Sequence, residues 1–143
     1  MGHTTYGFKD LSVTMAHPAM GQIEIYGTGA KSITFAMAND VSSHDVAADG
    51  SVMTSKIEAQ NGTVTIVVQQ TSEAHKWFTK LHNYLNAGHL SEWAEISLIA
   101  TGSHMRVTHE GSKMSIQKRP EAPYQSQGGE MSWAFLVSEL KEY

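Results

Sequence analysis

Three of the chain's eight histidines, His75, His82 and His89, follow one another at seven-residue spacing on a segment with helical periodicity. Seven residues are two helical turns, or roughly 10.5 Å along the axis, so neighbouring imidazoles cannot bind one ion. Histidine pairs that chelate a metal from one helix are spaced i, i+4. We therefore expect no metal site and no cofactor, and we expect these histidines to lie in solvent or at interfaces.

Two short stretches contain residue types used in ion binding or catalysis, and both have the wrong spacing. In "DVAADG", counted from Asp45, the third position is Ala47 and the twelfth is Lys56, where a calcium loop needs an oxygen ligand and a bidentate glutamate. In "SHD", Ser43 to Asp45, the three residues are consecutive and cannot form a catalytic relay. We therefore predict that the protein has no catalytic residues and is not an enzyme.

Composition narrows the classes of protein to which the chain could belong. The 143 residues are 41% hydrophobic with a net charge of −4, which predicts one globular domain spanning residues 1–143. The negative charge argues against general nucleic-acid binding and against an anionic membrane as partner. There is no cysteine, which excludes disulfide scaffolds and thiol catalysis. No stretch approaches the ~18 apolar residues of a membrane span.

Alternation of apolar and polar residues dominates the sequence. It places Val64, Ile66 and Val68 on one face of a strand, and Thr63, Thr65, Val67 and Gln69 on the other. The same period recurs in "LSVTM" (11–15), "SITFAM" (32–37) and "EMSWAFLV" (130–137), and "QIEIY", "EISLIA", "MRVTH" and "KMSIQ" fit further strands, with turns at "NG" (61–62), "DG" (49–50), "EGS" (110–112) and "QGG" (127–129). These patterns predict half-buried antiparallel strands.

One segment has helical periodicity instead, with Ala74, Trp77, Phe78, Leu81 and Leu85 on a single stripe. Thr71 or Ser72 can cap its start, and Gly88 can end it in the left-handed conformation. The helix is predicted at about residues 72–87. Because one helix cannot cover both faces of a large sheet, the predicted fold is mainly β: an antiparallel β-sandwich or a partly rolled barrel with one flanking α-helix.

The region from about residue 39 to residue 56 is small, polar and weakly periodic. It is too long for a routine hairpin loop in a compact domain. We predict an extended loop here, and loops of this length are usually functional or mobile.

The order of these segments resembles the tail tube proteins of contractile-tailed bacteriophages. The resemblance spans nearly the whole chain and is carried by "ADGSVMTSKI" (48–57), "NGTVTIVVQQTS" (61–72) followed by the helix, and the closing "GGEMSWAFLVSEL" (128–140). The stretch "HMRVTHEGSKMS" matches less well, because the family varies there.

The resemblance implies a structural virion protein that forms hexameric rings, which stack into the tube through which genome DNA passes without specific binding. Its partners would be other copies of itself, a sheath protein on the exterior, and baseplate, initiator and terminator proteins, after synthesis in the cytoplasm of a bacterial host. The extended loop would make the contact between rings, through Val41, Ser42, Ser43, His44, Asp45, Val46, Asp49, Val52 and Met53.

The strand alternation also suggests a channel wall. The faces expected to point away from the core are small and mostly uncharged, and they carry the candidate lumen residues Thr34, Ala36, Thr63, Thr65 and Gln69. Acidic residues near the strand ends, such as Asp40 or Glu58, would give the channel a negative potential. DNA slides along a wall of this kind more readily than along a basic one.

Three alternatives stay open at this point. The chain could be a secretion-system tube subunit of the same architecture. It could be a monomeric β-sandwich with a ligand pocket lined by Trp93, Trp133 and neighbouring aromatic residues. It could also be a hydrolase with a scattered Ser/His/Asp site. The mass of the purified protein would distinguish the two tube-subunit hypotheses, which require assembly, from a persistent monomer.

Overall fold

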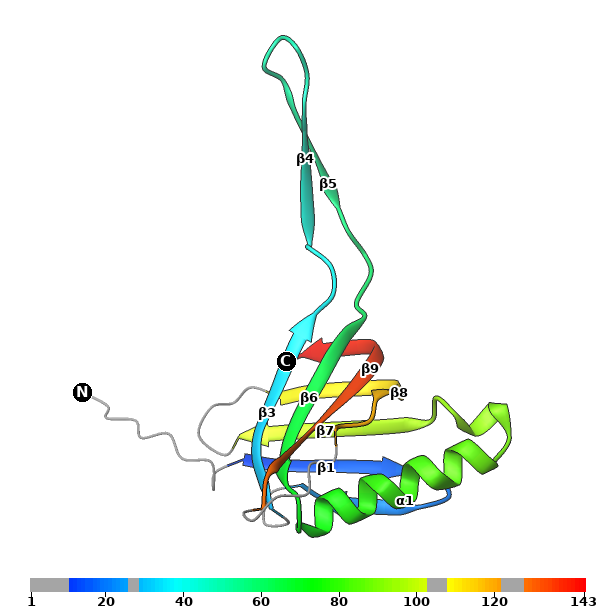
Figure 1. The fold of residues 1–143 in the computed structure, drawn as a ribbon. Coiled ribbons are helices and arrows are strands. Elements are labelled where there is room, and N and C mark those ends of the chain that lie inside the picture. Colours follow the sequence, from blue (N-terminus) through cyan, green and yellow to red (C-terminus); the bar gives the residue numbers. More distant parts are fainter. Residues whose placement is uncertain (1–10, 26–28, 103–107, 122–127) are drawn as a thin grey trace, which may run out of the picture.

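The computed structural model describes residues 11–25, 29–102, 108–121 and 128–143 (Figure 1). These residues contain one seven-stranded antiparallel sheet, ordered β2-β1-β7-β8-β9-β6-β3, and a separate two-stranded hairpin, β4-β5. The strands are β1 (Leu11–His17), β2 (Gly21–Glu24), β3 (Ala30–Met37), β4 (Ser42–Val46), β5 (Val52–Lys56), β6 (Gly62–Gln69), β7 (Ile96–Gly102), β8 (Thr108–Lys118) and β9 (Glu130–Glu142). Helix α1 (Glu73–Ala87) and the 3-10 turn η2 (Leu90–Glu92) follow β6.

The sheet curls strongly along its length. In Figure 1, β3 and β6 run steeply while β1 and β7 cross the molecule. Phe35 of β3 stacks on His109 of β8 with ring centroids 4.4 Å apart, although β6 and β9 lie between these strands in the sheet order. The chain therefore forms a half-barrel, which confirms the prediction of a mainly β, partly rolled barrel with one helix.

Helix α1 covers the concave face of the sheet. Four residues of the predicted stripe, Ala74, Phe78, Leu81 and Leu85, are buried, and the fifth, Trp77, is only partly buried. The Phe78 ring lies 5.5 Å from the rings of both Trp133 and Phe135 on β9. The inward residues of β6 also confirm the alternation, since Val64, Ile66 and Val68 are fully buried.

The two ends of α1 differ in how well the sequence predicts them. Ser72 caps the start, and its hydroxyl accepts a hydrogen bond from the His75 N–H at 3.1 Å. The left-handed ending expected at Gly88 is wrong, because this residue is extended with φ −89°. Glycine avoids crowding there, since a Cβ would lie 3.0 Å from the Tyr84 carbonyl oxygen and 3.1 Å from a carboxylate oxygen of Glu92.

The turn expected at "EGS", residues 110–112, is also wrong. Within the described residues this segment belongs to one long strand, β8, in which Glu110 pairs with both Ile99 and Lys141. Gly111 serves close packing, since a Cβ there would meet the Met114 sulfur at 3.1 Å and a Val137 methyl at 3.2 Å. The start of the strand predicted over "MRVTH" and the first residue of the "QGG" turn lie outside the described residues.

Candidate assembly surfaces

The region predicted as an extended loop is a β-hairpin instead. Strands β4 and β5 pair in register from Ser42 with Lys56 to Val46 with Val52. The reason is local: a D-G turn flanked by two valines favours a hairpin, and pairing satisfies backbone groups that a loop would leave to water. Gly50 in the turn has φ +88°, a value that L side chains rarely adopt.

The tip of the hairpin is held by its own polar groups. One carboxylate oxygen of Asp49 accepts hydrogen bonds from the Ser51 hydroxyl at 2.7 Å and from the Ser51 N–H at 2.9 Å. These bonds favour the ionised carboxylate and lower the pKa of Asp49 below its usual range. The tip therefore presents a negative charge.

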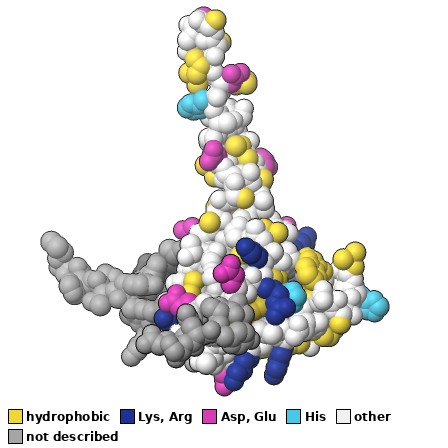
Figure 2. All heavy atoms as spheres, viewed as in Figure 1, with side chains coloured by type: hydrophobic (Ala, Val, Ile, Leu, Met, Phe, Trp, Pro, Cys, Tyr) yellow, Lys and Arg dark blue, Asp and Glu magenta, His cyan; other side chains and the backbone are white. Residues whose placement is uncertain are grey.

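The hairpin projects from the body as an arm (residues 41–57, the β4-β5 arm), as Figures 1 and 2 show. Every residue of both strands is exposed. Apolar side chains are among them, with exposed fractions of 73% for Val41, 64% for Val46, 55% for Val52 and 60% for Met53. An isolated two-stranded hairpin is at best marginally stable in water, so this arm is a surface that a partner would stabilise.

The expected ring-contact residues therefore share one element. By the strand register, Ser42, His44 and Val46 lie on one face of the arm with Val52, and Ser43 and Asp45 lie on the other with Met53. Val41 lies at the base and Asp49 at the tip. No contact with another copy tests these positions, and their role stays a prediction.

A hollow of about 450 Å³ opens at the base of the arm, lined by Met37, Val41, Lys56, Ile57, Glu58, Ala59, Gln60, Leu140, Lys141, Glu142 and Tyr143. We call it the basal hollow. Met37 is 48% exposed and Tyr143 is 64% exposed. Alternation along "SITFAM" puts Met37 on the same face as Ile33 and Phe35. Those two are half-buried against the core, whereas Met37 is exposed because β3 leaves the body there.

The candidate lumen residues lie together on the convex face of the sheet. Thr34 pairs with Thr65, and Ala36 pairs with Thr63, on the adjacent strands β3 and β6. Gln69 is exposed at the end of β6. Since the buried residues of β6 alternate with these, the set faces away from α1. Asp40 and Glu58 lie near the base of the arm and are exposed.

The aromatic residues of the ligand-binding alternative do not form a common pocket. Trp133 is fully buried, and its indole N–H donates to His75 Nδ1 at 3.1 Å. It borders a hollow beside α1 that Trp93 does not line. Trp93 packs half-buried against the core.

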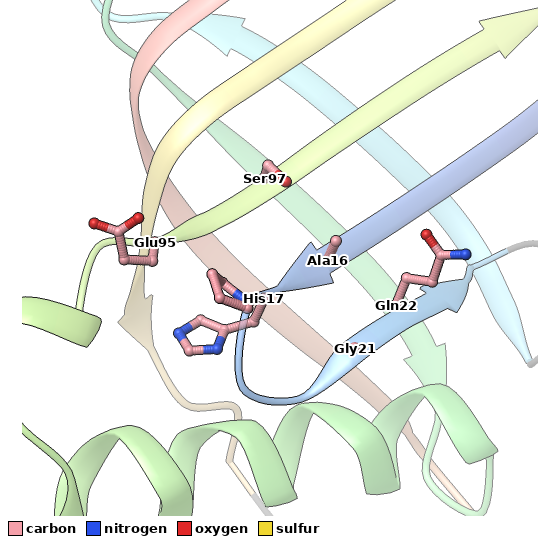
Figure 3. A pocket seen from close by; sticks show the side chains of 7 residues that line it. Ala16, His17, Gly21, Gln22, Glu95 and Ser97 are labelled. Atoms are coloured by element: carbon pink, nitrogen blue, oxygen red, sulfur yellow. The ribbon is translucent and has the colours of Figure 1, made fainter.

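A second hollow, of about 400 Å³, lies beside the β1-β2 turn and is lined by Ala16, His17, Pro18, Gly21, Gln22, Glu95 and Ser97 (Figure 3). His17 is engaged at both ring nitrogens: Nδ1 accepts from the Ala19 N–H at 3.1 Å, and Nε2 lies 3.0 Å from the Glu92 carbonyl oxygen. The imidazole therefore links the turn to η2.

Metal binding and membrane insertion are two further possibilities for the described residues. No group of three histidine or acidic side chains there could hold a metal ion. No helix among them is long and apolar enough to cross a membrane.

Comparison with known proteins decides what this fold belongs to. A family model described as the bacteriophage PhiTE tail tube protein matches residues 3–143. The chain belongs to this tail tube family. It is thus a structural component of a phage tail, as the resemblance implied. No curated protein matches the chain by sequence.

Solved structures share the fold at low sequence identity. The cap of the anti-feeding prophage, its tube-terminating cap, aligns with TM-score 0.65 at 10% identity over 100% of this chain and 93% of that one. The sheath-tube complex of an extracellular contractile injection system aligns with TM-score 0.63 at 10% identity over 97% and 91%. The sheath/tube terminator of that system aligns with TM-score 0.64 at 9% identity over 99% and 98%. These structures therefore share the half-barrel fold with this chain.

Proposed function

We propose that this chain is the repeating subunit of the tail tube, that its copies close into hexameric rings, and that the rings stack into a channel for genome DNA. The observation that carries the proposal is the β4-β5 arm: an exposed hairpin with apolar side chains on a subunit whose family forms tubes. The number six comes from the resemblance to contractile-tail tube proteins.

Lateral joining is supported by the open edges of the sheet. Within the described residues, β2 and β3 are the outermost strands, and each pairs on one side only. An unpaired edge offers a row of backbone donors and acceptors to a neighbouring chain. A ring in which the edges of adjacent copies lie together would satisfy these groups and join the half-barrels into one continuous wall.

Stacking is supported by the match between the arm and the basal hollow. The arm carries Val46 and Val52 beyond the body, and the hollow presents Met37 and Tyr143 at its base. Burying these apolar groups against the next ring would contribute about 1 kcal/mol for each valine. The arm of one ring would then lie along the next ring, and the basal hollow at its base would face that same neighbouring ring.

The convex face suits a channel wall. Thr34, Thr65 and their neighbours offer small, uncharged groups, and a surface without cations gives phosphates no charged partner. In this arrangement α1 faces the exterior, because it packs on the opposite side of the sheet.

Further partners follow from this placement. The similar structures include a sheath-tube complex and sheath/tube terminators of an injection system. By analogy this subunit would contact a sheath on its outer face, and initiator and terminator proteins at the ends of the tube. It would be made in the cytoplasm of the host and then become part of the virion.

Negative-stain microscopy of the purified protein across concentration tests the proposal directly. Rings or tubes are expected, and only monomer, even after seeding with a tail initiator, would contradict it. A matched variant replaces residues 41–53 with a short Gly/Ser hairpin; it should keep the circular dichroism of the body and lose the tubes. Normal tubes from that variant would show that the arm does not stack the rings.

A further inference from the structure

Basic side chains are concentrated on the side of the body that carries α1. The helix contributes Lys76 and Lys80, one turn apart and both exposed, and exposed Arg119 follows β8. Figure 2 shows lysine and arginine side chains gathered over the part of the body where α1 lies. None of the three forms an ion pair with another described residue. Exposed Glu73 on α1 and exposed Glu121 beside Arg119 offset part of this charge, so the face keeps a small positive excess on a chain whose net charge is −4.

A hollow of about 350 Å³ lies within this face, lined by Gln70, His75, Thr79, Arg119, Pro120, Met131 and Trp133. Its floor is apolar, since Trp133 and Met131 belong to the buried core. Its walls are polar, and Arg119 supplies the only full positive charge among the lining residues. We call it the α1 hollow.

The orientation of His75 in the α1 hollow is fixed by its neighbours. Trp133 donates its indole N–H to His75 Nδ1 at 3.1 Å, so that nitrogen is an acceptor without a proton. The neutral ring therefore carries its proton on Nε2, which is a hydrogen-bond donor. Burial, and then the charge of Arg119, lower the pKa of His75 and keep the ring neutral. The α1 hollow thus combines a guanidinium fork with one neutral N–H donor.

We propose that the α1 hollow binds a carboxylate side chain from an acidic segment of a second protein, with Arg119 as the charged partner and His75 as a second donor. A guanidinium fork matches the two oxygens of a carboxylate. Lys76 and Lys80 extend the positive surface along the helix and would attract further acidic residues of the same segment.

An acidic protein segment fits this face better than a nucleic acid. A strand of DNA or RNA is held by a longer run of cations with aromatic rings available for stacking. At the α1 hollow, Trp133 and Phe78 are fully buried and offer no ring face to a base, and the exposed Tyr84 lies toward the other end of α1. The inference rests on the proposed function in one respect: if the convex face lines the channel, α1 points outward and the partner is a protein that surrounds the tube.

Fluorescence anisotropy with labelled hexaglutamate at low salt tests the proposal on the soluble subunit. Wild type should bind, and Arg119→Gln should weaken binding about tenfold, since a hydrogen bond to a charged group is lost. Lys113→Asn is the matched control: it removes one charge from β8, and Lys113 has φ +51°, which asparagine tolerates. Binding by the control should stay within about twofold of wild type.

Arg119→Lys separates the α1 hollow from a simple charge effect. It keeps the charge but loses the fork, so binding should weaken nearly as much as in Arg119→Gln. Wild-type affinity of Arg119→Lys for hexaglutamate would overturn the proposal. So would a DNA duplex that binds as tightly as hexaglutamate and is lost in the same variants, because the face would then be a nucleic-acid surface.

The tube assay keeps this inference separate from the proposed function. Arg119→Gln should still form normal tubes. If wild type forms tubes but hexaglutamate does not bind, only the carboxylate site is refuted. If hexaglutamate binds as expected but wild type never assembles, the tube proposal fails and the binding site stands.

Discussion

Replacing Val46 and Val52 by threonine tests the stacking role of the β4-β5 arm with almost no change in shape. The two valines face each other across the hairpin and are 64% and 55% exposed. Threonine keeps the β-branch and the strand preference, so the hairpin and the isolated subunit should be unaffected. Only the burial of the two side chains by another ring would change.

The expected cost follows from the exposed fractions. A methyl group that becomes buried contributes about 0.8 kcal/mol, and slightly more than half of each valine is available to be covered. Desolvating each new hydroxyl adds about 0.5 kcal/mol. The double variant therefore loses about 2 kcal/mol per subunit, and the critical concentration for tube assembly should rise about thirtyfold.

A sedimentation assay of pelletable polymer against protein concentration measures this shift. Ile99→Thr on β7 is the control, because Ile99 is also exposed, at 52%, but lies on the convex face of the body. Its critical concentration should stay within about threefold of wild type. If the double variant assembles at the wild-type concentration, the arm does not bury these valines and the stacking argument is refuted.

Three further outcomes are expected. Thr34→Lys with Thr65→Lys should leave tube formation intact but make tubes retain DNA at low salt, measured by co-sedimentation with labelled duplex; unchanged retention would place these strands away from the channel. Phe78→Ala should lower the free energy of unfolding by about 3–5 kcal/mol in urea denaturation, because the ring is fully buried against Trp133; a loss below about 1 kcal/mol would contradict that packing. Stability should fall as pH drops from about 7 toward 5, because burial lowers the pKa of His75 and of His82 below 6.5, so the unfolded chain binds more protons. His75→Gln should reduce that pH dependence, and an unchanged slope in urea titrations at the two pH values would contradict it.

Local pattern alone predicts much of this fold. Alternation assigns Val64, Ile66 and Val68 to the buried face of β6, and the period of 3.6 residues identifies the buried stripe of α1. Both are properties of a single element, so they can be determined from neighbouring residues. The position of the cap is predicted for the same reason, and the structure selects Ser72 from the two candidates.

Errors arise where a residue's role depends on packing that the local pattern does not show. Gly88 and Gly111 look like signals for a helix end and a turn, yet each lies where a Cβ would be crowded, by Tyr84 and Glu92 at Gly88 and by Met114 and Val137 at Gly111. The arm was predicted as a loop because its strands have no buried face, and without a buried face the alternation disappears. The D-G turn between Val46 and Val52 was the available signal.

Residue pattern is enough to assign the class of protein: a mainly β chain with one capped helix and a segment order that resembles tail tube proteins. Three features became visible only in the folded chain: the curl that stacks Phe35 on His109, the projection of the arm, and the α1 hollow that brings Arg119 beside His75. The physical reason is that periodicity fixes the face on which a side chain lies. Strand order and curl, which come from pairing between distant segments, determine what that face meets.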